Sequence, residues 1–296
     1  IKTDTRQLRA YIVHPVLSSD RSSEADYKLE EAVRLSEALD VKVIASDLIN
    51  VREIRASEYF GKGKLDDMAA VINAHEVDLL VVNTNIAPIQ QRNLERKLKV
   101  KVVDRSGMIL EIFGLRAATK EGKLQVELAR QNYERSRLVR TWTHLERQRG
   151  GQGFLAGPGE TQIESDRRML DMRISKLKRQ IEDVRRTRAL QRKKRQRAPE
   201  RVVALVGYTN AGKSTLFNRV TDGNVLVKDM LFATLDTTHR LMELPSGSEA
   251  ILSDTVGFIS DLPTDLITAF RATLEEVQEA DLILHVRDVT DPLSEQ

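Results

Sequence analysis

The feature that most constrains this chain is a glycine-rich stretch between an apolar run and a helical pattern. Residues 207–214 read GYTNAGKS, which fits G-x-x-x-x-G-K-[ST], and VVALV (202–206) stands directly before them. Gly207 and Gly212 let the backbone curl until successive N–H groups converge, and the helix that follows adds its positive end. Lys213 can then reach the β- and γ-phosphate oxygens, and the adjacent serine hydroxyl can bind Mg²⁺. Strand, loop and helix in this order predict a P-loop nucleotide site.

A second acidic element follows the P-loop. ILSD (251–254) is an apolar run that ends in an acid, and it continues as DTVG (254–257), a D-x-x-G sequence. An aspartate at the end of a strand beside the P-loop strand can hold Mg²⁺, and the Gly257 N–H can reach the γ-phosphate. FATLDTT (232–238) lies between the two motifs, and a threonine there would complete the magnesium shell as a switch loop does. The residues alone do not choose among Thr234, Thr237 and Thr238.

The first hundred residues alternate strand and helix patterns. Strands are expected at 8–16, 41–46, 78–83 and 100–104, and helices at 23–39, from about Lys64, and from Pro88 to Leu98. Strands separated by helices predict a parallel sheet that is covered on both faces.

The middle of the chain, from about Ser106 to Arg197, is almost entirely of helical pattern. Two long helices are expected, at 111–149 and 163–195, around GGQGFLAGPGE (150–160), whose glycines and proline break a helix. This arrangement predicts an antiparallel hairpin. Its buried seam is expected to hold Met169, Met172, Ile174, Leu177, Ile181 and Val184.

Charge is concentrated in this same middle part. The whole chain of 296 residues has a net charge of +3, but residues 105–197 carry 24 Lys and Arg against 11 Asp and Glu, a net charge of +13. The other residues together carry −10. A basic segment between acidic ends is typical of a surface that binds nucleic acid, and also of a solvated helical face.

Several classes of protein are excluded by composition. The chain has no cysteine, which excludes a disulfide scaffold, a cysteine-ligated zinc site and a thiol nucleophile. No apolar run approaches the ~20 residues of a membrane span, and no signal-peptide pattern opens the chain. We therefore expect a cytoplasmic protein without a transmembrane segment.

Several motifs carry a family resemblance. GYTNAGKST (207–215), DTVGF (254–258) and FATLDTT (232–238) resemble the translation-factor-related GTPases, in the branch that contains Era, Obg and HflX. IFGLRAATKEGKLQVELA (112–129) and GPGETQIESDRR (157–168) closely resemble the HflX family, and these helical motifs are more specific than the P-loop. The resemblance covers nearly the whole chain.

The resemblance implies a fold and a function. The fold is α/β in three parts: an N-terminal parallel-sheet α/β domain (1–105), a basic antiparallel helical hairpin (106–197), and a P-loop GTPase domain (198–296). The function is that of a Mg²⁺-dependent GTPase, converting GTP to GDP and phosphate, which binds the large ribosomal subunit and its rRNA and splits or rescues stalled ribosomes under stress. In the family the loop between the two long helices, here about 147–161, reaches toward the peptidyl-transferase centre. A monomer is expected.

The resemblance also implies site residues. Lys213, Thr234 and Gly257 would act in catalysis, and Ser214 and Thr234 would bind the metal. The nucleotide would contact Gly207, Tyr208, Thr209, Asn210, Ala211, Gly212, Lys213, Ser214, Thr215, Phe232, Ala233, Thr234, Leu235, Asp236, Asp254, Thr255, Val256 and Gly257. Asn210 resembles the asparagine that binds K⁺ in some related GTPases. Phe258 stands where many relatives of Ras place a water-orienting glutamine, so slow intrinsic hydrolysis is expected.

One expected motif is absent. Guanine selection uses [NT]-K-x-D, and no such motif follows the strand expected at 282–286 before Gln296. We therefore expect an incomplete GTPase domain, in which guanine specificity is implied by the family alone. Three alternatives remain: a signalling GTPase with protein partners, an RNA-remodelling nucleoside triphosphatase, and a metabolic P-loop kinase.

Overall fold

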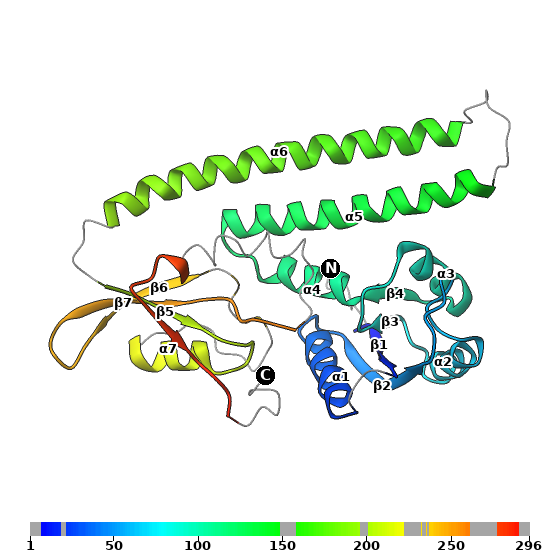
Figure 1. Ribbon diagram of the computed structural model, residues 1–296, viewed down its shortest axis with the longest axis horizontal. Helices are drawn as coiled ribbons and strands as arrows, with labels where there is room; N and C mark the ends of the chain where they lie inside the picture. Colours follow the sequence, from blue (N-terminus) through cyan, green and yellow to red (C-terminus); the bar gives the residue numbers. More distant parts are fainter. Residues whose placement is uncertain are drawn as a thin grey trace, which may run out of the picture. The chain divides into compact units, whose positions relative to one another are not determined.

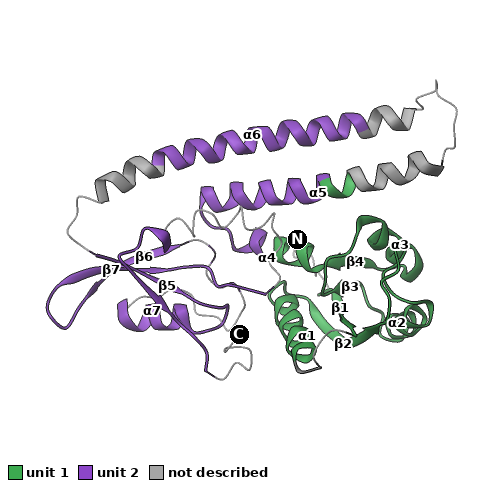
Figure 2. Cartoon of the chain, in the orientation of Figure 1, with its two compact units in different colours: residues 1–112, 136–163 green, residues 113–135, 164–296 purple. Residues whose placement is uncertain are grey.

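A computed structural model describes residues 7–18, 22–148, 158–195, 201–221, 232, 235, 237–260 and 277–289. The chain divides into two units, which Figure 2 distinguishes by colour. Unit 1 comprises residues 1–112 and 136–163, and unit 2 comprises residues 113–135 and 164–296. Each unit is described by itself.

Unit 1 contains a parallel four-stranded sheet (Figure 1). Its strands are β1 (Arg9–Leu17), β2 (Lys42–Val51), β3 (Leu79–Val82) and β4 (Lys101–Asp104), in the order β2-β1-β3-β4. The connecting helices are α1 (Ser22–Glu37), α2 (Lys62–Ala74) and α3 (Pro88–Leu98). The predicted parallel sheet is confirmed, with every strand of that region found within a few residues of its expected place.

Both faces of this sheet are buried. One apolar cluster joins Tyr11, Val13, Leu80 and Val82 of the strands to Leu65, Met68 and Ile72 of α2 and Leu94 and Leu98 of α3. Ala10 and Ile12 alternate with the β1 members of that cluster and are also fully buried, so they face the opposite side. Helix α1 packs on β1 and β2.

The limits of α3 follow from its sequence. Pro88 occupies the first turn, and the Gln90 side chain accepts a hydrogen bond from the Ala87 N–H at 2.8 Å. The helix ends where Lys99 adopts a left-handed conformation (φ 57°) and donates its N–H to the Glu95 carbonyl.

The prediction of one continuous helix over residues 111–149 is wrong in one respect, because two helices occupy this region. Helix α4 (Arg105–Arg116) ends before α5 (Lys120–Gln148) begins. Thr119 marks the start of the second helix: its Oγ1 accepts the Gly122 N–H at 2.9 Å and so caps α5.

Helix α6 (Pro158–Arg195) runs antiparallel beside α5, which confirms the hairpin (Figure 1). An ion pair between Arg135 of α5 and Asp171 of α6 joins the two helices at 3.0 Å. Helix α6 begins five residues earlier than expected, inside the predicted glycine-rich loop. Residues 149–157 of that loop lie outside the described residues.

The predicted seam of α6 needs correction. Met169 and Met172 are 44% and 64% exposed, so their expected place in the core is wrong. The buried or half-buried apolar residues of this stretch recur alternately every four and three positions: Leu170, Ile174, Leu177, Ile181 and Val184. This 3.5-residue period defines one helical face, and the two methionines fall beside it.

Unit 2 also contains a four-stranded sheet. Its strands are β5 (Arg201–Val206), β6 (Thr238–Glu243), β7 (Glu249–Asp254) and β8 (Leu282–His285), in the order β6-β7-β5-β8, and α7 (Lys213–Thr221) follows β5. Strands β7 and β8 pair with β5 in parallel, while β6 pairs with β7 antiparallel. Strand β6 was not predicted from the sequence.

No described helix combines the length and the apolar character that crossing a bilayer requires.

A buried ion pair ties α4 to α1 in unit 1. The Arg105 guanidinium donates to Glu31 Oε2 and to Asn83 Oδ1, both at 2.7 Å. The Arg105 and Glu31 side chains are 4% and 8% exposed. Asn83 also contacts the His14 ring at 3.1 Å, so polar groups within β1 and directly after β3 and β4 form one network.

Replacing Glu31 by alanine would leave the buried Arg105 guanidinium without its carboxylate. We expect Glu31→Ala to lower the stability of unit 1 by about 3–5 kcal/mol. Native-state hydrogen exchange of the β1 amides measures this opening free energy. The neighbouring Glu30→Ala is the matched control, because Glu30 pairs with Arg34 on the exposed face of the same helix. It should change stability by about 0.5 kcal/mol or less, and equal effects of the two variants would contradict the assignment.

Candidate nucleotide-binding site

The turn after β5 has the geometry of a P-loop. Gly207 has φ +150°, and a Cβ there would overlap the Val286 carbonyl oxygen, so only glycine fits. Asn210 and Gly212 also have positive φ, at 63° and 89°. The backbone therefore curls tightly before α7 begins at Lys213, as the glycine-rich sequence predicts.

Lys213 is held inside this curl. Its side chain is buried, and its ammonium donates hydrogen bonds to the carbonyls of Gly207 at 3.0 Å and Tyr208 at 2.5 Å. Burial lowers the pKa of Lys213 from 10.5 to about 8, and the nearby Asp254 carboxylate opposes that shift. The lysine is therefore fixed within the loop whose N–H groups would face a phosphate chain.

Asp254 lies at the end of β7 and contacts the start of α7. The Ser214 hydroxyl donates to Asp254 Oδ2 at 2.6 Å, and the aspartate is completely buried. Strand pairing places Leu205 opposite Asp254, and the Thr255 hydroxyl donates to the Leu205 carbonyl at 2.6 Å. The two strand ends are thereby locked together beside the P-loop.

These residues fit a magnesium site that a nucleotide completes. A serine hydroxyl and a buried carboxylate are hard oxygen donors of the kind that Mg²⁺ prefers. Among the described residues, no group of three or more His, Cys, Asp and Glu could hold a metal ion. Mg²⁺ in nucleotide sites takes one or two protein oxygens together with phosphate oxygens and water, so the small donor set is the expected one.

The D-x-x-G turn lies directly against the P-loop. The Phe258 N–H donates to the Gly207 carbonyl at 3.0 Å, and the Thr209 N–H donates to the Phe258 carbonyl at 2.8 Å. A Cβ on Gly257 would lie 2.6 Å from Thr209 Cα, so glycine is required for this approach. The last residues of the two motifs, Thr215 and Gly257, are 42 positions apart in the sequence, yet the motifs form one surface.

The structure thus brings together two of the three predicted stretches, 207–215 and 254–257. Of the third, Phe232 and Leu235 are described and are buried. Ala233, Thr234 and Asp236 lie outside the described residues, and the metal-binding role of Thr234 stays a prediction.

One contact of this third stretch was missed from the sequence. The Phe232 ring packs edge-on against Phe113 of α4, with ring centroids 4.8 Å apart and an angle of 84° between the planes. No motif or spacing relates two residues that are 119 positions apart, so only the folded structure reveals it.

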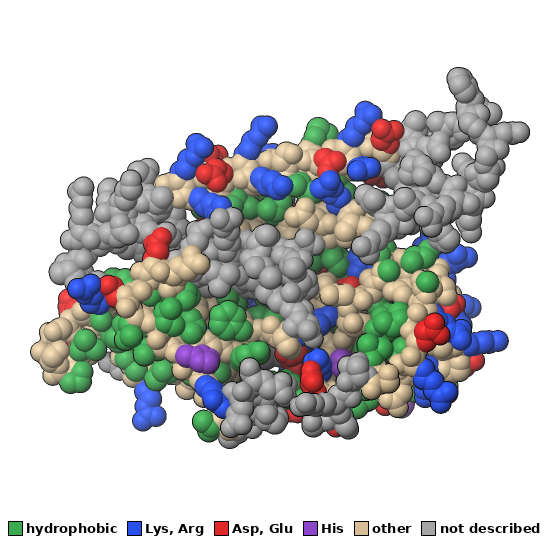
Figure 3. Space-filling view, in the orientation of Figure 1, with side chains coloured by type: hydrophobic (Ala, Val, Ile, Leu, Met, Phe, Trp, Pro, Cys, Tyr) green, Lys and Arg blue, Asp and Glu red, His purple; other side chains and the backbone are tan. Residues whose placement is uncertain are grey.

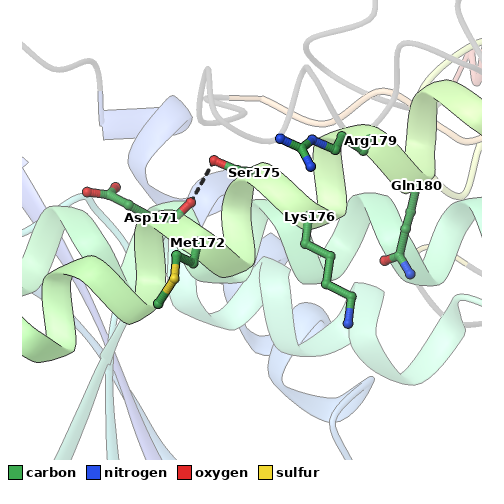
Figure 4. A pocket seen from close by; sticks show the side chains of 6 residues that line it. All are labelled: Asp171, Met172, Ser175, Lys176, Arg179 and Gln180. Carbon is green, nitrogen blue, oxygen red and sulfur yellow. Dashed lines mark hydrogen bonds between the residues drawn. The ribbon is translucent and has the colours of Figure 1, made fainter.

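The described surface of α6 is rich in charged side chains. Its described part presents lysines and arginines among a few acidic residues (Figure 3). A shallow hollow there is lined by Asp171, Met172, Ser175, Lys176, Arg179 and Gln180, and the Ser175 hydroxyl donates to the Asp171 carbonyl at 2.8 Å (Figure 4). All of these residues belong to a single helix, so the hollow does not enclose a ligand.

Three family models match successive parts of the chain. Residues 26–114 match the "GTP-binding GTPase N-terminal" family, and residues 116–195 match the "GTP-binding GTPase Middle Region". Residues 202–296 match the "50S ribosome-binding GTPase" family.

Curated relatives extend these matches over nearly the whole chain. The GTPase HflX of Magnetococcus marinus is 58% identical over 264 residues, which cover 89% of this chain and 61% of the relative. That of Escherichia coli is 46% identical, with 96% of this chain and 66% of the relative covered. That of Alkalihalophilus pseudofirmus is 45% identical, with 96% and 68% covered. The chain thus spans about three-fifths to two-thirds of the length of these relatives.

A solved structure of a GTP-binding protein shares the fold. A GTP-binding protein of Sulfolobus solfataricus, determined in complex with GDP, is 25% identical, with a TM-score of 0.53 over 97% of this chain and 72% of that one. The P-loop geometry, the three adjoining family matches and a relative that is 45% identical over two-thirds of its length lead to one conclusion: this chain belongs to the HflX family of GTPases.

Proposed function

We propose that this chain binds GTP with Mg²⁺, hydrolyses it to GDP and phosphate, and uses the cycle to control binding to the large ribosomal subunit. The observation that carries the proposal is the contact between Ser214 and the buried Asp254 at 2.6 Å, beside a P-loop whose lysine faces inward. Family membership supports guanine as the base.

In this mechanism each residue of the site has a distinct task. The N–H groups of the P-loop and the Lys213 ammonium bind the β- and γ-phosphate oxygens. Ser214 and Asp254 would hold Mg²⁺, together with Thr234. When bound, Mg²⁺ neutralises charge that develops on the β- and γ-phosphate oxygens. The Gly257 N–H donates a hydrogen bond to the γ-phosphate. Loss of the γ-phosphate on hydrolysis releases the D-x-x-G turn and the segment around Thr234.

The residue after the D-x-x-G motif, Phe258, bears on the rate of intrinsic GTP hydrolysis. Its side chain has no group that can orient a water molecule by hydrogen bonding, although it is 44% exposed beside the P-loop. Intrinsic hydrolysis is therefore slow in this proposal, and the ribosome accelerates it. A K⁺ ion at Asn210 would add positive charge near the phosphates, and equal hydrolysis rates in NaCl and KCl would contradict that part.

The distribution of charge and the family match both support the large ribosomal subunit as the binding partner. The match of residues 202–296 to a 50S ribosome-binding GTPase family supports the large subunit as partner, and the net charge of +13 over residues 105–197 suits rRNA. We propose that the N-terminal domain (1–105), the hairpin (106–197) and the GTPase domain (198–296) act together in splitting or rescuing stalled ribosomes under stress. The protein would do so as a cytoplasmic monomer.

The role of Asp254 can be tested by removing its charge. We expect Asp254→Asn to weaken Mg²⁺ affinity in the nucleotide complex about 10- to 100-fold, because the amide cannot replace a carboxylate that supports the metal. Titration of Mg²⁺ against a fluorescent GTP analogue measures the change. Glu249→Gln is the matched control, since Glu249 is an exposed carboxylate at the other end of the same strand. Unchanged Mg²⁺ affinity in Asp254→Asn would contradict the assignment.

Ribosome binding can be tested by sedimentation. With a non-hydrolysable GTP analogue, the intact protein should sediment with large subunits at physiological salt, and with GDP much less. Binding should weaken steeply as salt rises, because neutralised rRNA phosphates release counterions. A protein that stays unbound with the analogue would favour the alternative of a signalling GTPase with protein partners.

A further inference from the structure

A pair of polar side chains ties the end of β7 to β6. His239 of β6 lies directly opposite Ser253 of β7 in the antiparallel ladder, and His239 Nδ1 and Ser253 Oγ share a hydrogen bond at 2.7 Å. Ser253 is 1% exposed and directly precedes Asp254. The bond therefore acts one residue before the carboxylate that accepts the hydrogen bond of Ser214.

The burial of Ser253 makes its partner important. On the other side of β7, Ser253 is paired with Ala204 of β5, whose side chain has no polar atom. A buried hydroxyl that loses its partner keeps the cost of desolvation without the gain of a hydrogen bond. The end of β7 is therefore most stable where Ser253 reaches His239 on β6, the edge strand of this sheet.

Three successive side chains fix this part of β7 to three different elements. Ser253 bonds to β6, Asp254 accepts the hydrogen bond from the start of α7, and the Thr255 hydroxyl donates to β5. Neighbouring side chains of a strand point to opposite faces of the sheet, so Ser253 is held on the face opposite to that of Asp254. The backbone that carries the Asp254 carboxylate is thus held from both faces of the sheet.

We propose that His239 is a positioning residue for the magnesium site: through Ser253 it fixes the end of β7, and with it the Asp254 carboxylate. This inference rests on the proposed function, because the role of Asp254 toward Mg²⁺ belongs to it. His239 acts from the other face of the sheet, so it supports metal binding without contacting the metal.

The test compares two side chains of equal shape at position 239. Asparagine places a polar amide atom where histidine has Nδ1, whereas leucine places a methyl group there. His239→Leu should raise the Mg²⁺ concentration that half-saturates the complex with a fluorescent GDP about three- to tenfold, the effect of losing one hydrogen bond. His239→Asn should stay within twofold of the wild type. Binding of the fluorescent GDP in EDTA should change less than twofold in both variants, because no metal then depends on Asp254.

Two further substitutions separate this role from general loosening of the edge strand. Ser253→Ala should reproduce the effect of His239→Leu, and the double variant should lose no more than either single one. Leu241→Ala is the matched control, because Leu241 lies two residues further on the same face of β6, opposite Ile251, and is 52% exposed. It should leave Mg²⁺ affinity unchanged within twofold, and thermal unfolding verifies that each variant is folded.

Four results would overturn the inference. These are unchanged Mg²⁺ affinity in His239→Leu, an equal loss in His239→Asn, additive losses in the double variant, and a loss of binding in EDTA as large as that in Mg²⁺. Binding of GDP by the wild-type protein that is absent, or that does not depend on Mg²⁺, would instead overturn the proposed function.

Discussion

The hydrogen bond from Ser214 to the buried Asp254 is the contact on which the candidate nucleotide site depends. It joins the start of α7 to the end of β7, and it requires β5 and β7 to be parallel and in register. The Thr255 hydroxyl fixes that register at Leu205, and Gly257 brings the following turn against the P-loop. A buried carboxylate is costly unless it is hydrogen-bonded or binds a cation, so the Ser214 hydroxyl stabilises Asp254 at this position.

Much of the architecture could be predicted because it is encoded over short distances. Pro88 marks the start of α3, the alternation of strands and helices implies the parallel sheet, and GYTNAGKS after VVALV implies the loop and its helix. The predictions that were wrong also concerned short stretches. Thr119 caps a second helix within a continuous helical pattern. Met169 and Met172 lie beside the seam of α6, which contains Leu170 in their place together with the predicted residues from Ile174 to Val184.

Contacts between distant residues were harder to predict. The D-x-x-G motif suggested that Asp254 would lie near Ser214, because the carboxyl ends of neighbouring parallel strands meet at one edge of a sheet. Nothing comparable suggested that Phe113 would meet Phe232, since both appear in sequence as ordinary apolar residues. Strand β6 escaped prediction because its pairing with β7 is antiparallel, with half-exposed residues and no clear alternation.

The central claim is that the P-loop and Asp254 form a Mg²⁺-dependent site for guanine nucleotides. Competition for a labelled GTP analogue, with the intact protein in Mg²⁺, tests it most directly. The account predicts that unlabelled GTP and GDP displace the analogue, while ATP at a hundredfold excess does not. Displacement by ATP as effective as that by GTP, or no binding of the analogue at all, would contradict it.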